Sequence, residues 1–133
     1  MSDMALEVRV DLPHDEAIEL VTNALKAEGF GVLTRIDAHK TFKEKIDKDF
    51  RDYTILGACN PVLAHKALSS RPDAGLMLPC NVIVEKDGDG SLVRIIDPMK
   101  MMFAGGFADD PVLGEVGGEA DARLRRVAKE LGG

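Results

Sequence analysis

Two Cys-Asn pairs hold most of the side chains in this sequence that could do chemistry. One lies in the run Gly57-Ala58-Cys59-Asn60-Pro61 and the other in Leu78-Pro79-Cys80-Asn81-Val82. Cys59 comes just before an expected helix N-terminus, where the helix dipole favours the nucleophilic thiolate. The structural alternative makes both cysteines small buried hydrophobic residues, Asn60 a helix cap and Asn81 an edge-strand or turn residue.

His65 could extend this cluster, because it lies four residues after Pro61 on the same side of the expected helix. An imidazole near Cys59 would suit a thiol-dependent enzyme with Cys80 as the resolving partner. Two thiols and one imidazole would also suit zinc or copper, although Cys59 and Cys80 are 21 residues apart and neither half has paired ligands. The candidate pocket or thiol site therefore consists of Cys59, Asn60, His65, Cys80 and Asn81.

The methionines and the other two histidines have simpler expected roles. Thioethers are soft copper ligands, but filling of irregular gaps in the core is the favoured interpretation of Met77, Met99, Met101 and Met102. His14 and His39 stand near expected helix starts, and we expect both to be exposed.

The common catalytic motifs are missing from the sequence. It has no phosphate-binding glycine loop, no nucleophile elbow and no paired metal-ligand motif. The leading hypothesis is therefore a non-enzymatic domain that binds a small ligand or a protein. The alternatives are a thiol-dependent enzyme or redox or sulfur-handling protein using Cys59, and a soft-metal (Zn/Cu) binding protein. The sequence names no cofactor.

Composition limits the partners and the location. The 133 residues are 45% hydrophobic and 30% charged, which is typical of a globular chain able to build one core. The net charge of -6, from 23 acids and 17 bases, disfavours binding to nucleic acid. The sequence shows no export signal and no apolar run long enough to span a membrane. We therefore expect no membrane partner, a cytoplasmic location and reduced thiols.

The periodicity of apolar residues predicts the elements that position these groups. Alternation of apolar and polar residues, or short apolar runs, predict five strands at residues 6–10, 30–36, 53–59, 81–85 and 91–96. Proline and cap residues predict helices that begin near Pro13, Asp37, Asn60, Asp97 and Asp110.

Three local details complete this prediction. Residues 69–79 contain three prolines or glycines and are expected to form an irregular return path. Two Asp-Gly pairs in residues 86–90 predict a hairpin with a loop longer than two residues. Gly114, Gly117 and Gly118 weaken the start of the last helix, so its secure part is residues 119–131.

The order β-α-β-α-β-α-β-β-α-α, without an internal repeat or linker, predicts one domain over residues 1–133. Helices with one apolar side each favour an α+β fold, a two-layer sandwich in which a mixed five-stranded sheet carries helices largely on one face.

Four motifs together resemble the prokaryotic family called domain of unknown function 302. They are Gly29-Phe30-Gly31-Val32-Leu33, the first Cys-Asn run with Ala64-His65, the second Cys-Asn run, and Ile96-Asp97-Pro98. The resemblance implies an α/β sandwich that forms a homodimer, and it implies no established activity, substrate or cofactor. It marks as positions of the family pattern Cys59, Asn60, Pro61, His65, Cys80, Asn81 and Asp97.

Overall fold

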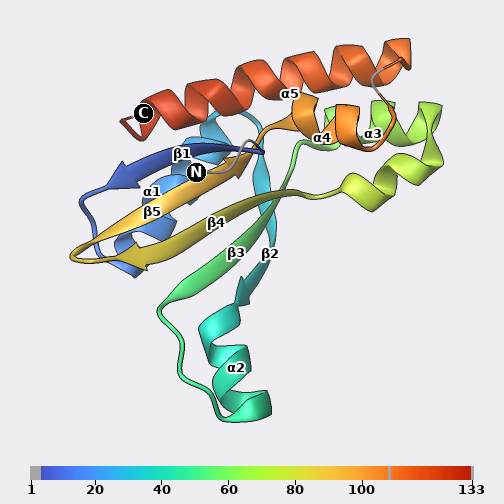
Figure 1. The fold of residues 1–133 in the computed structure, drawn as a ribbon. Helices are drawn as coiled ribbons and strands as arrows, with labels where there is room; N and C mark the ends of the chain where they lie inside the picture. Colours follow the sequence, from blue (N-terminus) through green and yellow to red (C-terminus); the bar gives the residue numbers. More distant parts are fainter. Residues whose placement is uncertain (1–3, 108, 133) are drawn as a thin grey trace.

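A five-stranded sheet forms the centre of the computed structural model, which describes residues 4–107 and 109–132. The strand order is β1-β5-β4-β3-β2 (Figure 1). The strands are β1 (Ala5–Val10), β2 (Gly31–Asp37), β3 (Tyr53–Cys59), β4 (Cys80–Asp87) and β5 (Gly90–Ile96). The predicted α+β sandwich is confirmed. The prediction of a mixed sheet is corrected, because every neighbouring pair is antiparallel.

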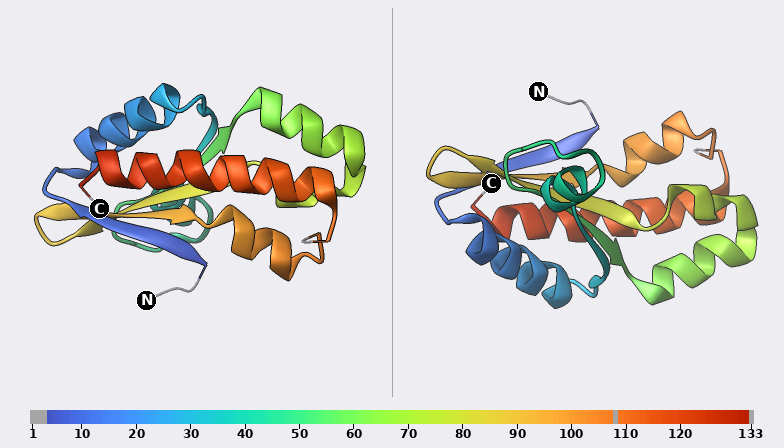
Figure 2. Two further views of the ribbon diagram at one scale, coloured as in Figure 1. Left: turned by 90° about the horizontal axis from the view of Figure 1, so that it is seen from above. Right: turned by 90° about the horizontal axis from the view of Figure 1, so that it is seen from below.

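Helices lie on both sides of this sheet, but only one side is well covered. The helices are α1 (His14–Ala27), α2 (Ala38–Ile46), α3 (Pro61–Ser70), α4 (Pro98–Ala104) and α5 (Pro111–Glu130), with a 3-10 helix, η1 (Pro72–Met77), between α3 and β4. The two longest, α1 and α5, pack on one face of the sheet. The views from above and below place α2 on the opposite side from α5 (Figure 2).

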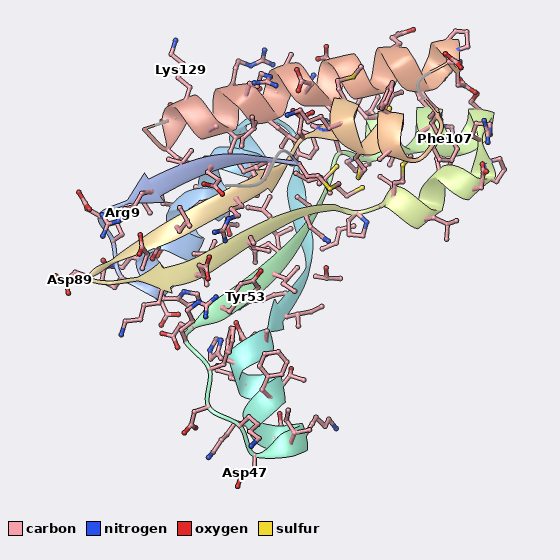
Figure 3. The ribbon with its side chains drawn as sticks, in the orientation of Figure 1. Arg9, Asp47, Tyr53, Asp89, Phe107 and Lys129 are labelled. Carbon is pink, nitrogen blue, oxygen red and sulfur yellow. The ribbon has the colours of Figure 1, made fainter. Side chains whose placement is uncertain are left out.

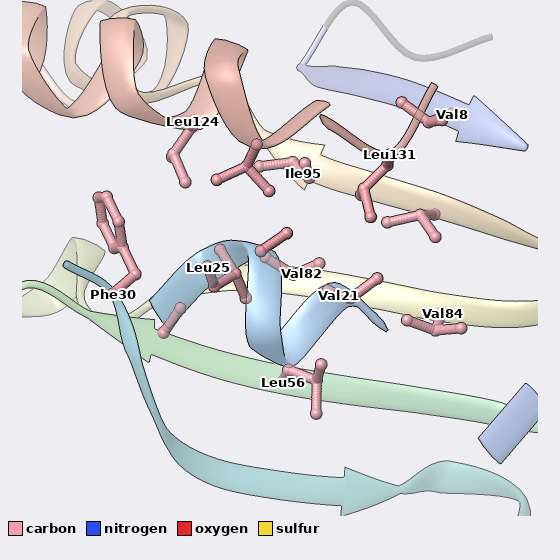
Figure 4. Close-up of a cluster of buried hydrophobic side chains, with 14 of the residues drawn as sticks. Val8, Val21, Leu25, Phe30, Leu56, Val82, Val84, Ile95, Leu124 and Leu131 are labelled. Atoms are coloured by element: carbon pink, nitrogen blue, oxygen red, sulfur yellow. The ribbon is translucent and has the colours of Figure 1, made fainter. Parts of the chain in front are cut away.

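The main core lies between the sheet and the pair α1 and α5. Period-two alternation turns every second residue of β4 and β5 toward the helices, as Val82, Val84 and Ile95 show (Figure 4), and Val93 is buried in the same core. The helices contribute residues at three- and four-residue spacing. The buried residues of α1 are Ala17, Ile18, Val21, Ala24 and Leu25.

Local chemistry explains several boundaries that the sequence predicted. Gly29 has φ +83° directly after α1, the left-handed conformation that ends a helix at low cost for glycine. The loop of the β4–β5 hairpin is shorter than expected, because Asp87 and Gly90 are register partners. Its two-residue loop begins with Gly88 at φ +60°, as a type II′ turn requires.

A second, smaller core lies beyond the end of the sheet. It joins α3, η1 and α4 to the N-terminal half of α5, and its buried members are Ala67, Ala74, Met102, Phe107, Leu113 and Val116. The expectation of an irregular return path is corrected, since residues 72–77 form η1. The predicted helix start at Asp110 is confirmed: α5 begins at Pro111, where the Asp110 carboxylate accepts the N–H groups of Val112 and Leu113.

No helix among the described residues is long and apolar enough to cross a membrane.

Candidate functional site

Cys59 and Cys80 come together at one end of the sheet. Cys59 is the last residue of β3 and Cys80 the first residue of β4. The two strands are antiparallel neighbours, and Ala58 is the register partner of Cys80. The segment that contains η1 therefore returns the chain, so Cys59 and Cys80 lie at the same end of the sheet, both as free thiols.

Both cysteines line one small cavity of about 50 Å³. Its wall is almost entirely apolar and comes from the end of β3, from α3, η1 and α4, and from α5. Leu63 and Ala67 of α3 line it together with Leu113 and Val116 of α5. The cavity thus lies in the second core and draws its wall from segments far apart in the sequence.

Sulfur is the most polarizable atom in this wall. Met77, Met101 and Met102 line the cavity together with the two cysteines. Sulfur atoms gather where α4, η1 and the cavity end of the sheet meet (Figure 3). Met99 is 40% exposed and does not line the cavity, so the predicted core-filling role applies to the other three methionines.

Burial raises the pKa of the Cys80 thiol to about 11, and the charge of Cys59 adds to this effect. Desolvation disfavours the thiolate because an anion loses its hydration in apolar surroundings. Cys80 is therefore a protonated, unreactive thiol at neutral pH.

Asn60 is a helix cap, as the structural alternative proposed. Its side-chain Oδ1 accepts the N–H of Leu63 at 3.1 Å, and Pro61 occupies the first turn of α3. The Asn60 side chain also packs against Gly29, where a Cβ atom would lie 2.9 Å from Nδ2. Asn60 thus fixes the start of α3 beside Cys59.

Asp97 fixes the start of α4 in the same way. Its Oδ1 accepts the N–H groups of Met99 and Lys100, while Arg125 of α5 lies 3.3 Å from its Oδ2. The Asp97 side chain is nearly buried. These contacts set the direction of α4 and hence place Met101 and Met102 at the cavity.

His65 and Asn81 lie outside the cavity. His65 is exposed on α3 and is absent from the cavity wall, so the expectation that it shares a pocket with Cys59 is not met. Asn81 is exposed on the opposite face of the sheet, because it alternates with Cys80 along β4. Of the five predicted site residues, the cavity gathers Cys59, Asn60 and Cys80.

A second polar cluster was not predicted from the sequence. The Thr54 hydroxyl donates to Asp37 Oδ1 at 2.8 Å, and His14 Nε2 lies 2.8 Å from the same hydroxyl oxygen. His14 must therefore donate through Nε2–H, which leaves Nδ1 as an acceptor. This Nδ1 is buried and has no hydrogen-bond partner among residues 4–107 and 109–132. The signal that could have revealed Thr54 is its place on the apolar face of β3.

The expectation that His14 and His39 are exposed is wrong. Desolvation lowers the pKa of His14 although Asp52 opposes the shift. His39 Nδ1 accepts the backbone N–H of Tyr53 at 2.9 Å, and its side chain is 16% exposed. Both rings are held by contacts with β3 and pack edge to face against each other.

The face of the sheet opposite α1 and α5 carries a row of register partners. The row crosses all five strands and consists of Ile36, Ile55, Ile83, Arg94 and Glu7, each the register partner of the next. Ile36 is 49% exposed. We use the name open sheet face for the face formed by these five residues and by the strand residues that alternate onto the same side of the sheet.

Ion pairs neutralise the charges on the open sheet face. Arg94 pairs with Glu7 and Glu85, and Arg51 lies 2.7 Å from the second oxygen of Glu85. Burial alone would raise the pKa of Glu85, but hydrogen bonds from the two arginines outweigh it and lower the pKa. The face therefore combines exposed isoleucine with charges that already have partners.

Comparison with known proteins agrees with the resemblance seen in the sequence. The family model described as domain of unknown function DUF302 matches residues 6–131. A crystal structure of an uncharacterized conserved protein DUF302 from Bacillus stearothermophilus is similar, with a TM-score of 0.84 and 27% sequence identity. The match covers 97% of this chain and 98% of the other. A search of curated proteins gives no match. The chain belongs to the DUF302 family.

Proposed function

We propose that this protein is a non-enzymatic binding domain whose ligand enters the cavity beside Cys59 and Cys80. The observation that carries the proposal is the chemistry of the wall, which offers apolar carbon and sulfur and almost no polar surface. Binding pockets are typically apolar with few polar groups, whereas catalysis needs a nucleophile and a base within reach of each other.

The same wall argues against the thiol-dependent enzyme. The Cys80 thiol has a pKa of about 11, so it is a poor nucleophile and a poor leaving thiol at neutral pH. The Asn60 side-chain oxygen is engaged in capping α3. His65, the base that this alternative requires, is exposed outside the cavity.

The size of the cavity restricts the ligand. A volume of about 50 Å³ has room for only a few non-hydrogen atoms. The group that enters is therefore small and either apolar or soft. A larger molecule would keep most of its atoms outside.

Xenon is a suitable probe, because dry apolar cavities take it up. We expect xenon to shift the methyl NMR resonances of Ala64 and Ala67 saturably in the wild type. Ala64→Leu should fill part of the cavity and weaken this response, whereas Ala122→Leu on the exposed side of α5 should leave it unchanged. Absence of a saturable shift at these methyls contradicts the binding proposal.

Alkylation separates this proposal from the enzyme. Iodoacetamide should react with Cys59 of the folded protein no faster than with a cysteine of the urea-unfolded chain. Faster reaction confined to Cys59 would instead indicate an activated nucleophile.

We also propose that the protein works as a homodimer, with a second copy on the open sheet face. Neutral, partly apolar surface suits self-association, because the chain as a whole has net charge -6 and two copies repel elsewhere. Helix α2 lies on the same side of the sheet (Figure 2). It adds apolar surface there, because it has no buried residue and Ile46 is 61% exposed.

Light scattering tests the dimer. The wild type should have twice the mass of one chain, and Ile55→Glu should produce monomers by placing an unpaired charge between Ile36 and Ile83. Ala122→Glu on the exposed side of α5 is the matched control and should stay dimeric. A monomeric wild type contradicts the proposal. The proposal assigns the protein to the cytoplasm of a prokaryote, where reducing conditions keep thiols free.

A further inference from the structure

We propose that the ligand of the cavity is an alkyl or acyl chain of about eight carbon atoms with an uncharged polar end. Its tip enters the cavity, and its body lies in an adjoining hollow. The inference deepens the proposed binding function and rests on it, since it names the ligand class of the same cavity. The observation that carries it is that the two spaces share three residues of their walls: Met77, Leu78 and Met101.

The adjoining space, which we call the outer hollow, has a volume of about 210 Å³. Besides the three shared residues, its wall contains Leu76, Pro79, Asn81 and Ile96. Asn81 is exposed on the open sheet face, whereas the cavity lies within the second core. The outer hollow therefore offers a route from the surface to the cavity.

The shared residues come from two segments that are neighbours at this end of the sheet. β4 begins after η1, β5 leads into α4, and the two strands pair in antiparallel fashion. Met77 and Leu78 belong to the first segment and Met101 to the second. Met77 also reaches toward the end of α4, because a Cβ atom at Gly105 would lie 2.8 Å from its Sδ. These side chains form the partition between the cavity and the outer hollow.

The partition is made of flexible side chains. Met77, Leu78 and Met101 are half-buried, whereas Met102, which lines only the cavity, is 7% exposed. Methionine is unbranched and has three rotatable bonds, so it changes shape at low cost. Rotation of Met77 and Met101 can therefore open the partition to the tip of a chain.

The two volumes set the length of the chain. A water-sized group occupies about 30 Å³ in a liquid, so about 50 Å³ in the cavity takes one or two carbon atoms. By the same measure the outer hollow, at about 210 Å³, takes about seven. The wall of the cavity is apolar carbon and sulfur, and Leu76 and Ile96 continue this apolar surface outward. A methylene chain matches such a wall along its whole length.

The polar end of the ligand lies at Asn81. Its amide both donates and accepts hydrogen bonds, which suits a hydroxyl or an amide end. Asn81 also borders a further hollow that contains Arg94, whose guanidinium already pairs with Glu7 and Glu85. A carboxylate end would meet two acidic side chains and a cation that they neutralise. The end group is therefore uncharged.

The test is an NMR titration of the full chain, labelled with carbon-13 in its methionine methyl groups, with 1-alkanols from 1-butanol to 1-decanol. Affinity should rise by roughly fourfold for each added methylene group and level off at about eight carbon atoms. The methyl resonances of Met77, Met101 and Met102 should shift saturably. Met99 lines neither space and should not respond.

Nuclear Overhauser contacts give the orientation of the chain. The terminal methyl group of 1-octanol should contact Met102 in the cavity, and the middle of the chain should contact Met101. Contacts of the hydroxyl end with Met102 overturn the orientation. Octanoate at neutral pH should bind more weakly than 1-octanol, and tighter binding of octanoate overturns the uncharged end.

Two exposed residues provide a matched pair of variants. Leu76 is 90% exposed and lines the outer hollow, whereas Val62 on α3 is 70% exposed and lines neither space. Leu76→Asp should weaken 1-octanol binding by roughly fourfold or more, the equivalent of at least one methylene contact, and should keep the xenon response. Val62→Asp should bind 1-octanol as the wild type does. Equal affinities of the two variants overturn the role of the outer hollow.

The xenon experiment separates this inference from the proposed function. A xenon response without tighter binding of the longer alkanols overturns the chain ligand and supports the binding domain. Absence of both responses overturns both proposals. An affinity that still rises at 1-decanol overturns the assigned length.

Discussion

His14 and Thr54 join α1 to the central part of the sheet through a single hydrogen bond, 2.8 Å from Nε2 to Oγ1. Thr54 is fully buried, and its own proton goes to Asp37. The hydroxyl therefore links two titratable groups that are 23 residues apart in sequence. This arrangement makes the stability of the fold depend on pH and on one hydroxyl oxygen.

The protonation of His14 should destabilise the protein in mild acid. Desolvation lowers its pKa in the folded state, so the unfolded chain binds the proton at a higher pH than the folded chain does. Stability is then complete above the unfolded value of 6.5 and declines as the pH falls below it toward the folded pKa. Urea unfolding at about pH 7.5 and about pH 5 should show this loss.

His14→Gln is the control, since its amide can still donate to Thr54 but cannot titrate. Its loss of stability between the two pH values should be smaller than that of the wild type. Equal losses in both proteins would assign the pH dependence to other groups.

Thr54→Val should cost about 1–3 kcal/mol, because the shape is kept while the oxygen that serves both His14 and Asp37 is lost. Thr22→Val is the matched control. Its hydroxyl donates to the carbonyl of Ile18 within α1, a local bond inside one helix, so its loss should cost less. Urea unfolding of both variants at neutral pH measures the difference, and similar costs would contradict the role of Thr54.

Gly117→Ala should destabilise the protein by about 1–3 kcal/mol, because the new Cβ would lie 2.6 Å from Met102 Sδ. Gly118→Ala meets no atom within 4 Å and should stabilise α5 by about 0.5–1 kcal/mol through helix propensity. The melting temperatures of the two variants should therefore shift in opposite directions from that of the wild type. Stabilisation by both would show that Met102 moves aside freely.

Local chemistry made much of this fold predictable. Residues 53–59 were predicted as a strand with the bounds that the structure has, because a short apolar run can be recognised without tertiary information. The cap roles of Asn60, Asp97 and Asp110 followed equally from residue type and a neighbouring proline. In each of these cases the decisive contact lies within three residues of the cap.

Tertiary contacts decided what the sequence left open. The antiparallel pairing of β3 and β4 depends on the return of residues 69–79, which have no periodic signal. That pairing brings Cys80 beside Cys59, whereas the exposure of His65 follows from which side of α3 packs on α5. The contact of Thr54 with His14 depends on how α1 lies on the sheet. These relationships join residues far apart in the chain, and local spacing carries no information about them.

Cys80 should resist alkylation in the folded protein. With a pKa of about 11, its thiolate fraction at about pH 8 is roughly one in a thousand, compared with roughly one in ten at the ordinary value of 9.0. In Cys59→Ser, which retains only Cys80, iodoacetamide labelling should therefore be at least about 100-fold slower in the folded protein than in urea. Because Cys59 contributes to the shift, the rate should rise with pH up to about 11 or somewhat below. A rate that levels off near pH 9 would show that burial does not protect the thiol, and would remove the main argument against a reactive cysteine at the cavity.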